Sequence, residues 1–142
     1  MTTIDENKAL ARRVPEEIAT EGKVDLVEEI SVEDPVEYGT FGEVRGREAI
    51  KAMITQILDA FPDFSATVED VVAEDDKVGM RVTLRGTHDG EPFMGIEPSG
   101  NGFEIQNMVI TRIEDGKIAE RWTIGDTAGM MEQLGVVDPP GS

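Results

Sequence analysis

The chain has 142 residues, of which 39% are hydrophobic, and this size and composition suit one globular domain with a single core. Its 30 acidic residues outnumber 13 basic ones and give a formal net charge of −17, which repels nucleic-acid phosphates. With no cysteine and one histidine, the sequence lacks the ligands for disulfides, thiolate catalysis and Cys- or His-rich metal sites, so we expect no bound metal.

The acidic residues are spread along the chain, as in VEDVVAEDDK and RIEDGKIAE. Dispersed carboxylates keep a protein soluble in concentrated salt, so we expect a halophilic source, with an ordinary acidic protein as the alternative. No run of roughly 18 apolar residues is present, and MTTIDENKALARR lacks the apolar segment of a secretory signal. We therefore expect a cytoplasmic protein without a membrane or nucleic-acid partner.

The first segment, IDENKALARRVPEEIATEG, has the periodicity of a helix. Ile4, Leu10, Val14 and Ile18 recur at steps of three and four residues or their sums. Pro15 lies inside this pattern and has no N–H to donate. We expect it to kink the helix or to split it in two.

Two further helices are expected between residues 23 and 61. KVDLVEEI (23–30) predicts a short one, and VEDPVEYGTFGEVRG (32–46) predicts a short extended piece followed by a loop. The clearest helix is REAIKAMITQILDAF (47–61), because its apolar residues form one stripe. Pro62 and Asp63 end it.

From residue 65 onward the apolar residues alternate with polar ones, which is typical of strands. The expected strands are SATVEDVVAE (65–74), KVGMRVTLRGTH (77–88), FEIQNMVITRI (103–113) and KIAERWTI (117–124). The Gly- and Pro-rich stretch DGEPFMGIEPSGNG joins the second strand to the third. DTAGMMEQL predicts the last helix, ended by Gly135.

This order predicts an α+β fold in which a curved antiparallel sheet wraps around the N-terminal helices. A curved sheet closed by helices makes a cone with an apolar interior, which suits a small-molecule ligand. We expect a single domain over residues 1–142, with a frayed tail at 136–142 that contains PPGS.

His88 is the first candidate for acid–base chemistry. Strict alternation along strand 77–88 puts it on the inward face with Val82 and Leu84. A pocket histidine would donate a proton or bind an oxyanion. The alternative is a histidine at the strand end that bonds to a neighbouring carbonyl, and the pattern leaves both open.

Asp126 is the second candidate, because it directly follows strand 117–124. At the rim or floor of an apolar cavity, a carboxyl group there is suited to proton transfer. The alternative is the N-cap of helix 127–134, a position where Asp is among the best residues. The two roles are compatible.

Several aromatic, amide and sulfur side chains are candidates for the cavity wall. Trp122 and Tyr38 each offer a large apolar surface with one hydrogen-bonding group, with a core position as the alternative for Trp122. Asn107 and Gln106 lie on opposite faces of strand 103–113, and the pattern does not say which points inward. The remaining candidates, as pocket, lid or core residues, are Phe41, Phe61, Phe93 and Met94.

Several stretches resemble one known family in their order and spacing. They are ENKALARRVPEEIATEGKVDLVEE, GREAIKAM, AFPDFSATVEDVVAEDDKV, RGTHDGEPFMGIEPSG, RIEDGKIAERW and DTAGMMEQLG. From about Glu6 to Gly135 the chain resembles the SnoaL-like polyketide cyclases, a branch of the NTF2-like superfamily.

This resemblance implies a cone-shaped α+β barrel, a homodimer or higher homo-oligomer, and an intramolecular aldol condensation without metal or cofactor. It implies that a carboxylate near the C-terminal end acts as general acid and base. Asp126 is the best match for this carboxylate, with the Thr123 position as a competing alignment. His88 or Asn107 would then stabilise the developing negative charge.

The chain also departs from the family pattern. Relatives often carry a histidine where this sequence has DPVEYG, with Tyr38 near that position, and Arg121 precedes Trp122 where histidine is common. We therefore weigh three functions. The first is a cofactor-free cyclase or isomerase that acts on a small, mostly apolar carbonyl compound. The second is a non-catalytic small-molecule-binding protein, and the third is an interaction protein whose second sheet face forms an oligomer.

Overall fold

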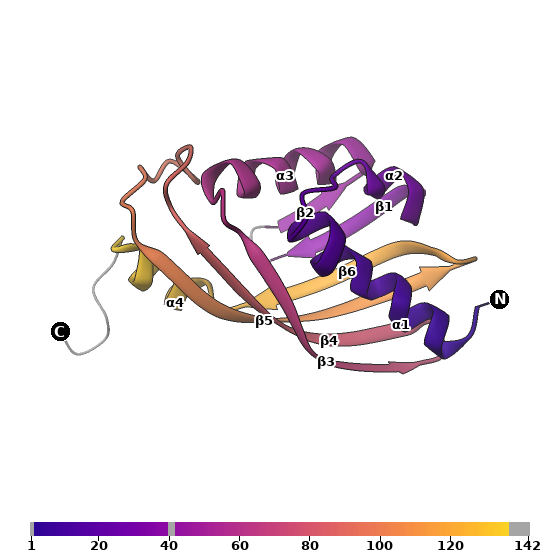
Figure 1. The fold of residues 1–142 in the computed structure, drawn as a ribbon. Coiled ribbons are helices and arrows are strands. Elements are labelled where there is room, and N and C mark those ends of the chain that lie inside the picture. The colour runs from indigo at the N-terminus through magenta and orange to yellow at the C-terminus, as the bar shows by residue number, and fades with distance from the viewer. Residues whose placement is uncertain (1, 40–41, 137–142) are drawn as a thin grey trace.

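The computed structural model describes residues 2–39 and 42–136. The helices within residues 4–60 lie over one face of a six-stranded sheet, and a short C-terminal helix follows the last strand (Figure 1). In chain order the elements are α1 (Ile4–Arg13), the π-helix η1 (Val14–Ala19), α2 (Leu26–Ile30), β1 (Ser31–Gly39), β2 (Gly42–Arg45), α3 (Arg47–Ala60), β3 (Ser65–Glu74), β4 (Lys77–Thr87), β5 (Gly102–Glu114), β6 (Lys117–Gly125) and α4 (Thr127–Leu134).

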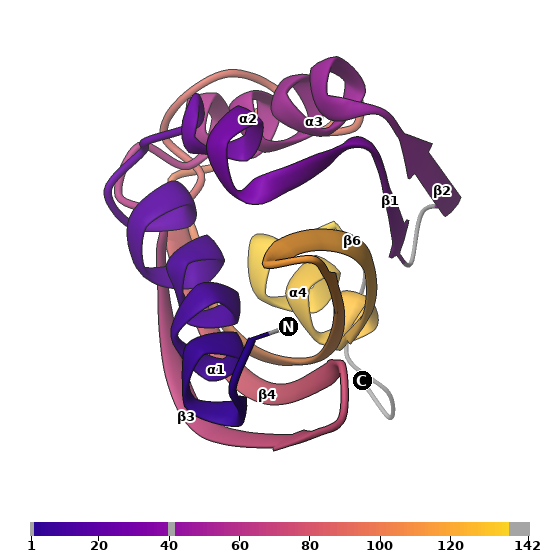
Figure 2. The ribbon, with the colours of Figure 1, turned by 90° about the vertical axis from the view of Figure 1, so that its right-hand side faces the viewer.

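The sheet has the strand order β2-β1-β6-β5-β4-β3. Strands β3 to β6 form an antiparallel meander, whereas β1 pairs with β6 in parallel. Viewed along its length, the sheet curls strongly under the helices, with β2 and β3 as its two edges (Figure 2). The α+β class and the curved sheet around helices are confirmed, but the sheet is mixed rather than wholly antiparallel, and it is not closed.

Strand β1 is the reason for the mixed sheet, and the sequence pattern did not predict it in full. The segment 32–46 was expected to be a short extended piece and a loop, but β1 and β2 form an antiparallel pair there. Polar residues Glu33, Asp34 and Glu37 interrupt the apolar alternation of β1, and Pro35 lowers its strand propensity. Pairing with β6 compensates for this weak local preference.

The N-terminal helix changes its geometry at the proline. A capping box of Thr3 and Glu6 starts α1. The helix then widens into the π-helix η1, and Thr20 donates its N–H to the Pro15 carbonyl at 3.2 Å. A wider turn relieves the clash that proline causes in a regular helix. The expected disturbance at Pro15 is therefore confirmed, as a π-helical turn.

The strands from β3 to β6 match the expected ranges to within one residue at each end. Their inward side chains pack against α1, α3 and α4 in three clusters of buried residues. One cluster packs against α1 and contains Val78, Met80, Val82 and Val109. A second joins η1, α2 and α3 to β6 through Ile18, Ile30, Ile50 and Ile118, and a third joins β5 to α4 through Phe61, Phe103, Ile105 and Leu134. These clusters leave a hollow between them.

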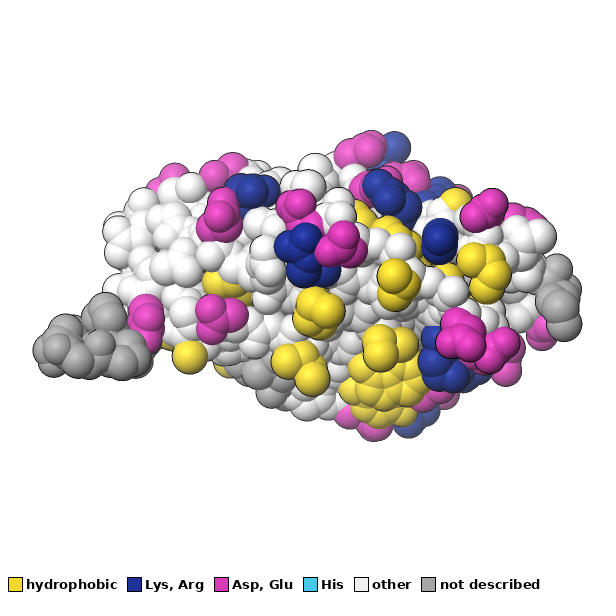
Figure 3. Space-filling model, turned by 90° about the horizontal axis from the view of Figure 1, so that it is seen from below, with side chains coloured by type: hydrophobic (Ala, Val, Ile, Leu, Met, Phe, Trp, Pro, Cys, Tyr) yellow, Lys and Arg dark blue, Asp and Glu magenta, His cyan; other side chains and the backbone are white. Residues whose placement is uncertain are grey.

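The outer face of the sheet carries a loose row of exposed apolar side chains among paired charges (Figure 3). Ile124 is 76% exposed, Met108 58% and Ile110 47%. Within the described ranges, no helix has the length and apolar character needed to cross a membrane. Of the tail expected at 136–142, all but Val136 lies outside the described residues.

Candidate functional site

A cavity of about 250 Å³ lies between the inner face of the sheet and the helical layer. Most of its wall is apolar and comes from η1, α3 and the middle strands. Representative lining residues are Pro15, Ile18, Ile54, Ile57, Leu58, Phe64, Val82, Leu84, Phe93, Phe103, Ile105, Val109 and Met130. A concave, mostly apolar pocket with a few polar groups is the usual form of a small-molecule site.

Two polar side chains of this wall, Arg121 and Thr123, bond to a third, Glu37. The Arg121 Nη1 atom donates to both carboxylate oxygens of Glu37, each at 2.9 Å, and the Thr123 hydroxyl donates to Oε1 at 3.2 Å. Glu37 is buried, and the Arg121 side chain is only 16% exposed. A carboxylate has about four acceptor positions, so three contacts leave Oε2 able to accept one more hydrogen.

Strand pairing brings these residues together from distant parts of the sequence. Glu37 and Arg121 are direct partners in the parallel pair of β1 and β6. Because side chains alternate along a strand, Arg121, Thr123 and Gly125 share the inward face of β6. Arg121 Nε is buried and has no hydrogen-bond partner among the described residues, so the guanidinium keeps a donor beyond its bonds to Glu37.

Asn107 stands on the neighbouring strand and faces Gly125 across the pair of β5 and β6. It lines the cavity, whereas Gln106 lines a polar groove on the other side of the sheet. The Asn107 amide makes no hydrogen bond within the described residues, and its buried Oδ1 lies over the Gly125 backbone. Of the polar side chains expected to line the pocket, the structure places Asn107 in the cavity wall.

Asp126 lies outside this cavity. It is exposed and forms the N-cap of α4, where its Oδ1 accepts the Gly129 N–H at 2.9 Å. With Arg81, Arg85 and Glu104 it lines the outer polar groove rather than the apolar hollow. Of the two compatible roles expected for Asp126, the cap is present.

His88 is fully buried just beyond β4, but it is not among the residues that line the cavity. Its Nε2–H donates to the Glu91 carbonyl at 3.0 Å, and its ring lies 5.1 Å from that of Phe61. This is the geometry of the alternative reading, a histidine at the strand end bonded to a neighbouring carbonyl. The Nδ1 atom has no partner in the described part of the chain.

Alternation turns Trp122 and Tyr38 to the outer face of the sheet, where their rings stack with centroids 5.6 Å apart. The Tyr38 hydroxyl donates to Glu120, which also accepts from Arg112 at 2.6 Å. The Arg112 hydrogen bond holds the pKa of Glu120 below its ordinary value, and partial burial and the Glu120 contact raise the pKa of Tyr38. This outer network is structural support for β1 and β6.

Of the four remaining candidates, two lie away from the cavity, one falls outside the described residues and one lines the cavity. Phe61 is fully buried in the cluster beside α4, Met94 is 56% exposed on the loop after β4, and Phe41 falls outside the described residues. Phe93 does reach the cavity wall. The expected site is therefore brought together only in part.

Glu37 and Arg121 are the residues that sequence reasoning missed as a site. One signal pointed to them, because β6 reads with Ile118, Trp122 and Ile124 on one face and Arg121 and Thr123 on the other. The apolar face looked like the inner one, whereas at this end of β6 the polar face lines the cavity. Only the parallel pairing with β1 brings Glu37 to Arg121.

The arrangement places one carboxylate, one guanidinium and one free amide at the polar part of an apolar hollow. A carboxylate that faces an apolar ligand can remove a proton from carbon, and nearby N–H donors stabilise the oxyanion that results. Among the described residues, no three Asp, Glu or His side chains come together as a metal site.

Comparison with known proteins adds a family and a set of relatives. The model of the SnoaL-like polyketide cyclases matches residues 9–134. The chain is 32% identical to the aklanonic acid methyl ester cyclases DauD of Streptomyces sp. (strain C5) and DnrD of Streptomyces peucetius, over 89% of this chain and 80% and 88% of theirs. The crystal structure of IdmH from Streptomyces antibioticus superposes with a TM-score of 0.78 at 33% identity, covering 92% of this chain and 99% of IdmH.

Proposed function

The chain belongs to the SnoaL-like polyketide cyclase family, and from this premise we propose that it is a cyclase- or isomerase-type enzyme for a small, mostly apolar carbonyl compound. The observation that carries the proposal is the buried Glu37 carboxylate in the cavity wall, held by Arg121 and Thr123. The relatives named as cyclases support ring closure as the reaction class, and the family resemblance implies that the ring closes by an aldol condensation.

In this reaction Glu37 removes a proton from the carbon beside a carbonyl group, which leaves an enolate. The enolate carbon attacks a second carbonyl carbon of the same molecule, so that a C–C bond forms and the C=O π bond opens to an alkoxide. Protonated Glu37 returns its proton to that alkoxide. Atoms and charge balance, so the product is an isomer of the substrate and no cofactor is consumed.

Catalysis by Asp126 and His88 stays a prediction, and we do not build the reaction on them. Asp126 is engaged in the cap of α4 on the outer side, and His88 does not line the cavity. Neither carboxyl nor imidazole reaches the hollow in which an apolar ligand would lie. In this proposal Glu37 takes the acid–base role that the family resemblance implies for a carboxylate near the C-terminal end of the chain.

A second candidate function is the binding of a small molecule without turnover. Three hydrogen bonds hold the Glu37 carboxylate, which is how a purely structural ion pair is also arranged. In this case the same cavity holds the ligand, and Glu37 stays bound to Arg121 throughout. The two functions differ in one measurable event, proton removal from the ligand.

Solvent deuterium exchange separates these functions. We use 2-tetralone, a bicyclic ketone whose C1 protons are acidified by the carbonyl, and follow their replacement by deuterium with NMR. The proposal predicts that wild-type protein accelerates the exchange and that aklanonic acid methyl ester, offered in parallel, yields an isomer of unchanged mass. Binding of both compounds with no exchange and no isomer would establish the second function instead.

A homodimer or higher homo-oligomer is proposed on the outer sheet face. Ile124, Ile110 and Met108 are exposed there, beside the partly buried stacked pair of Tyr38 and Trp122. A second copy of the chain offers the same area, and a two-fold contact would cover both. Light scattering should give a multiple of 15.5 kDa for the wild type and a lower mass for Ile124→Glu.

A halophilic source and a cytoplasmic location are proposed from composition alone. The net charge of −17 is the support for the first, because salt screens the repulsion among surface carboxylates. The melting temperature should then rise steadily from about 0.1 to about 3 M KCl, because added salt screens the repulsion among the carboxylates. A melting temperature that is flat or falls over this range would contradict the salt adaptation.

A further inference from the structure

Gly125 lies on the inward face of β6, directly opposite Asn107. A Cβ atom built on Gly125 would come within 2.8 Å of the Asn107 Cγ and closer still to Oδ1. Glycine inside a strand often marks a place where another group approaches the backbone closely. Gly125 has no positive φ, so the absence of a side chain, rather than an unusual backbone, is what this position provides.

The close contact between the Asn107 amide and Gly125 determines which amide atom can bind a ligand. Oδ1 is the amide atom nearest the Gly125 position, is buried, and has no partner among the described residues. Nδ2 lies farther away, at 3.4 Å from the Cβ position, and with respect to the described residues it makes no hydrogen bond and does not share the burial of Oδ1. Because Asn107 lines the cavity, the N–H donors are the part of the amide available to a ligand.

We propose that Gly125 is a positioning residue, which seats the Asn107 amide flat against β6 so that Nδ2 donates to the carbonyl oxygen of the ligand. This inference rests on the proposed function for the identity of the ligand as a carbonyl compound. With the amide in this position, the protein binds a ligand with an oxygen beside Glu37 and Arg121 more tightly than a ligand of the same shape without that oxygen. A larger residue at position 125 displaces the amide and removes that preference.

The test compares two ligands of nearly the same shape, 2-tetralone and tetralin, which lacks the carbonyl oxygen. Their dissociation constants are measured by NMR titration, and the ratio of the two constants reports recognition of the oxygen. One neutral hydrogen bond predicts a ratio of about threefold to tenfold in wild-type protein. In Asn107→Ala the ratio should fall to about one, because the donor is gone.

Gly125→Ala is the decisive variant, since it keeps the Asn107 amide and alters only its seat. Its ratio of dissociation constants should fall to about one, as in Asn107→Ala, while its backbone NMR spectrum stays that of a folded protein. Gly129→Ala is the matched control, because a Cβ there approaches the Asp126 carboxylate on the outer side in the same manner, and its ratio should equal the wild-type ratio. If Gly125→Ala failed to fold, the Asn107 side-chain N–H signals of the wild type would decide, since they must shift with 2-tetralone and not with tetralin.

A wild-type ratio in Gly125→Ala, or equal responses to both ligands in the wild type, would overturn the inference. These readouts use binding alone, so they stand apart from the proposed function. If Gly125→Ala and Asn107→Ala lose the ratio but the wild type catalyses no deuterium exchange, only the proposed enzyme function is contradicted. If the wild type catalyses exchange but Asn107→Ala keeps the wild-type ratio, only the proposed role of Gly125 and Asn107 is contradicted.

Discussion

Two polar side chains of this molecule sit over glycines in the same way, yet on opposite sides of the sheet. Asn107 lies over Gly125 inside the cavity, and Asp126 lies over Gly129 on the outside, with the Cβ position of each glycine less than 3 Å from the polar group. Asp126 accepts a hydrogen bond from the N–H of its glycine, whereas Asn107 has no partner among the described residues. A polar group that the protein satisfies is support for the fold, and an unsatisfied one is free for a ligand.

The same contrast runs along β6. Over residues 121–124 the outward side chains, Trp122 and Ile124, are apolar and partly or largely exposed, while the inward ones, Arg121 and Thr123, are polar and bonded to Glu37. This reverses the usual rule that the apolar face of a strand faces inward. At this end of β6 the inner face lines the cavity instead of packing into the core.

The largest effect on stability is expected for Arg121→Met. This change leaves the Glu37 carboxylate buried without its cation, which costs about 3–5 kcal/mol in the free energy of unfolding. Urea denaturation measures it. The control is Arg112→Met, which breaks the more exposed pair with Glu120 on the outer face and should cost about 1 kcal/mol or less. Equal losses in the two variants would contradict the distinction between inner and outer pairs.

A smaller effect is expected for Asp126→Ala. Loss of the N-cap bond to Gly129 should cost about 1 kcal/mol. Asp126→Asn should lose much less, because asparagine caps a helix about as well. Thermal or urea unfolding measures both variants. A greater loss of 2-tetralone affinity than of stability in Asp126→Ala would show that this carboxylate belongs to the ligand site.

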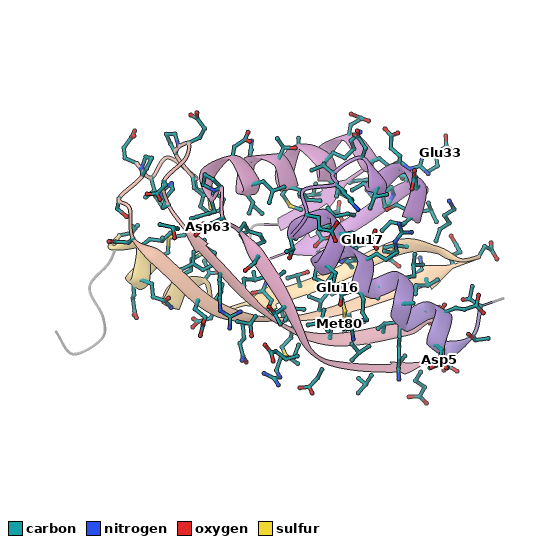
Figure 4. All side chains as sticks on the ribbon, in the orientation of Figure 1. Asp5, Glu16, Glu17, Glu33, Asp63 and Met80 are labelled. Carbon is teal, nitrogen blue, oxygen red and sulfur yellow. The ribbon has the colours of Figure 1, made fainter. Side chains whose placement is uncertain are left out.

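The smallest effect concerns pH and another outer carboxylate, Asp63, which lies where α3 gives way to β3 (Figure 4). Hydrogen bonds from the backbone N–H and the hydroxyl of Thr87 lower the pKa of Asp63 from its ordinary value of 3.8. A lowered pKa in the folded state stabilises the protein above pH 3.8, and this contribution is lost as pH falls through the folded-state pKa.

Asp63→Asn should therefore be less stable than the wild type near neutral pH, and the difference should shrink as the pH falls below 3.8. Urea unfolding at a series of pH values measures the difference. The control is Glu97→Gln, an exposed carboxylate with no side-chain hydrogen bond in the described part of the chain. A difference for Asp63→Asn that grows on acidification would reverse the sign and refute the assignment.

The local patterns of the sequence predicted most elements, because helix α3 and strands β3 to β6 follow simple periodicities. They did not predict β1 in full, since its charged residues and Pro35 hide the alternation and its partner β6 lies some 80 residues away. The site depends on that distant pairing. Periodicity also left open whether Asn107 or Gln106 points inward, a choice that the packing of Ile105 and Val109 against the core decides.

Asp126 illustrates the limit of reading a site from one segment. Its position before a short helix fits both a cap and a catalytic carboxylate, and only the path of β6 decides that it lies outside the cavity. Glu37 had no such local signature, because nothing in DPVEYG marks one of its carboxylates as buried. Arg121 and Thr123 point inward and hold the Glu37 carboxylate in the cavity wall by hydrogen bonds.

The central claim is that the inner carboxylate, not the outer one, performs proton transfer, and the deuterium exchange of 2-tetralone in two matched variants tests it most directly. Each variant, Glu37→Gln and Asp126→Asn, replaces one carboxylate by an amide of similar size. We predict that Glu37→Gln slows the exchange catalysed by the protein by about 100-fold or more, while Asp126→Asn exchanges at the wild-type rate. Loss of exchange in Asp126→Asn with full exchange in Glu37→Gln would contradict the account.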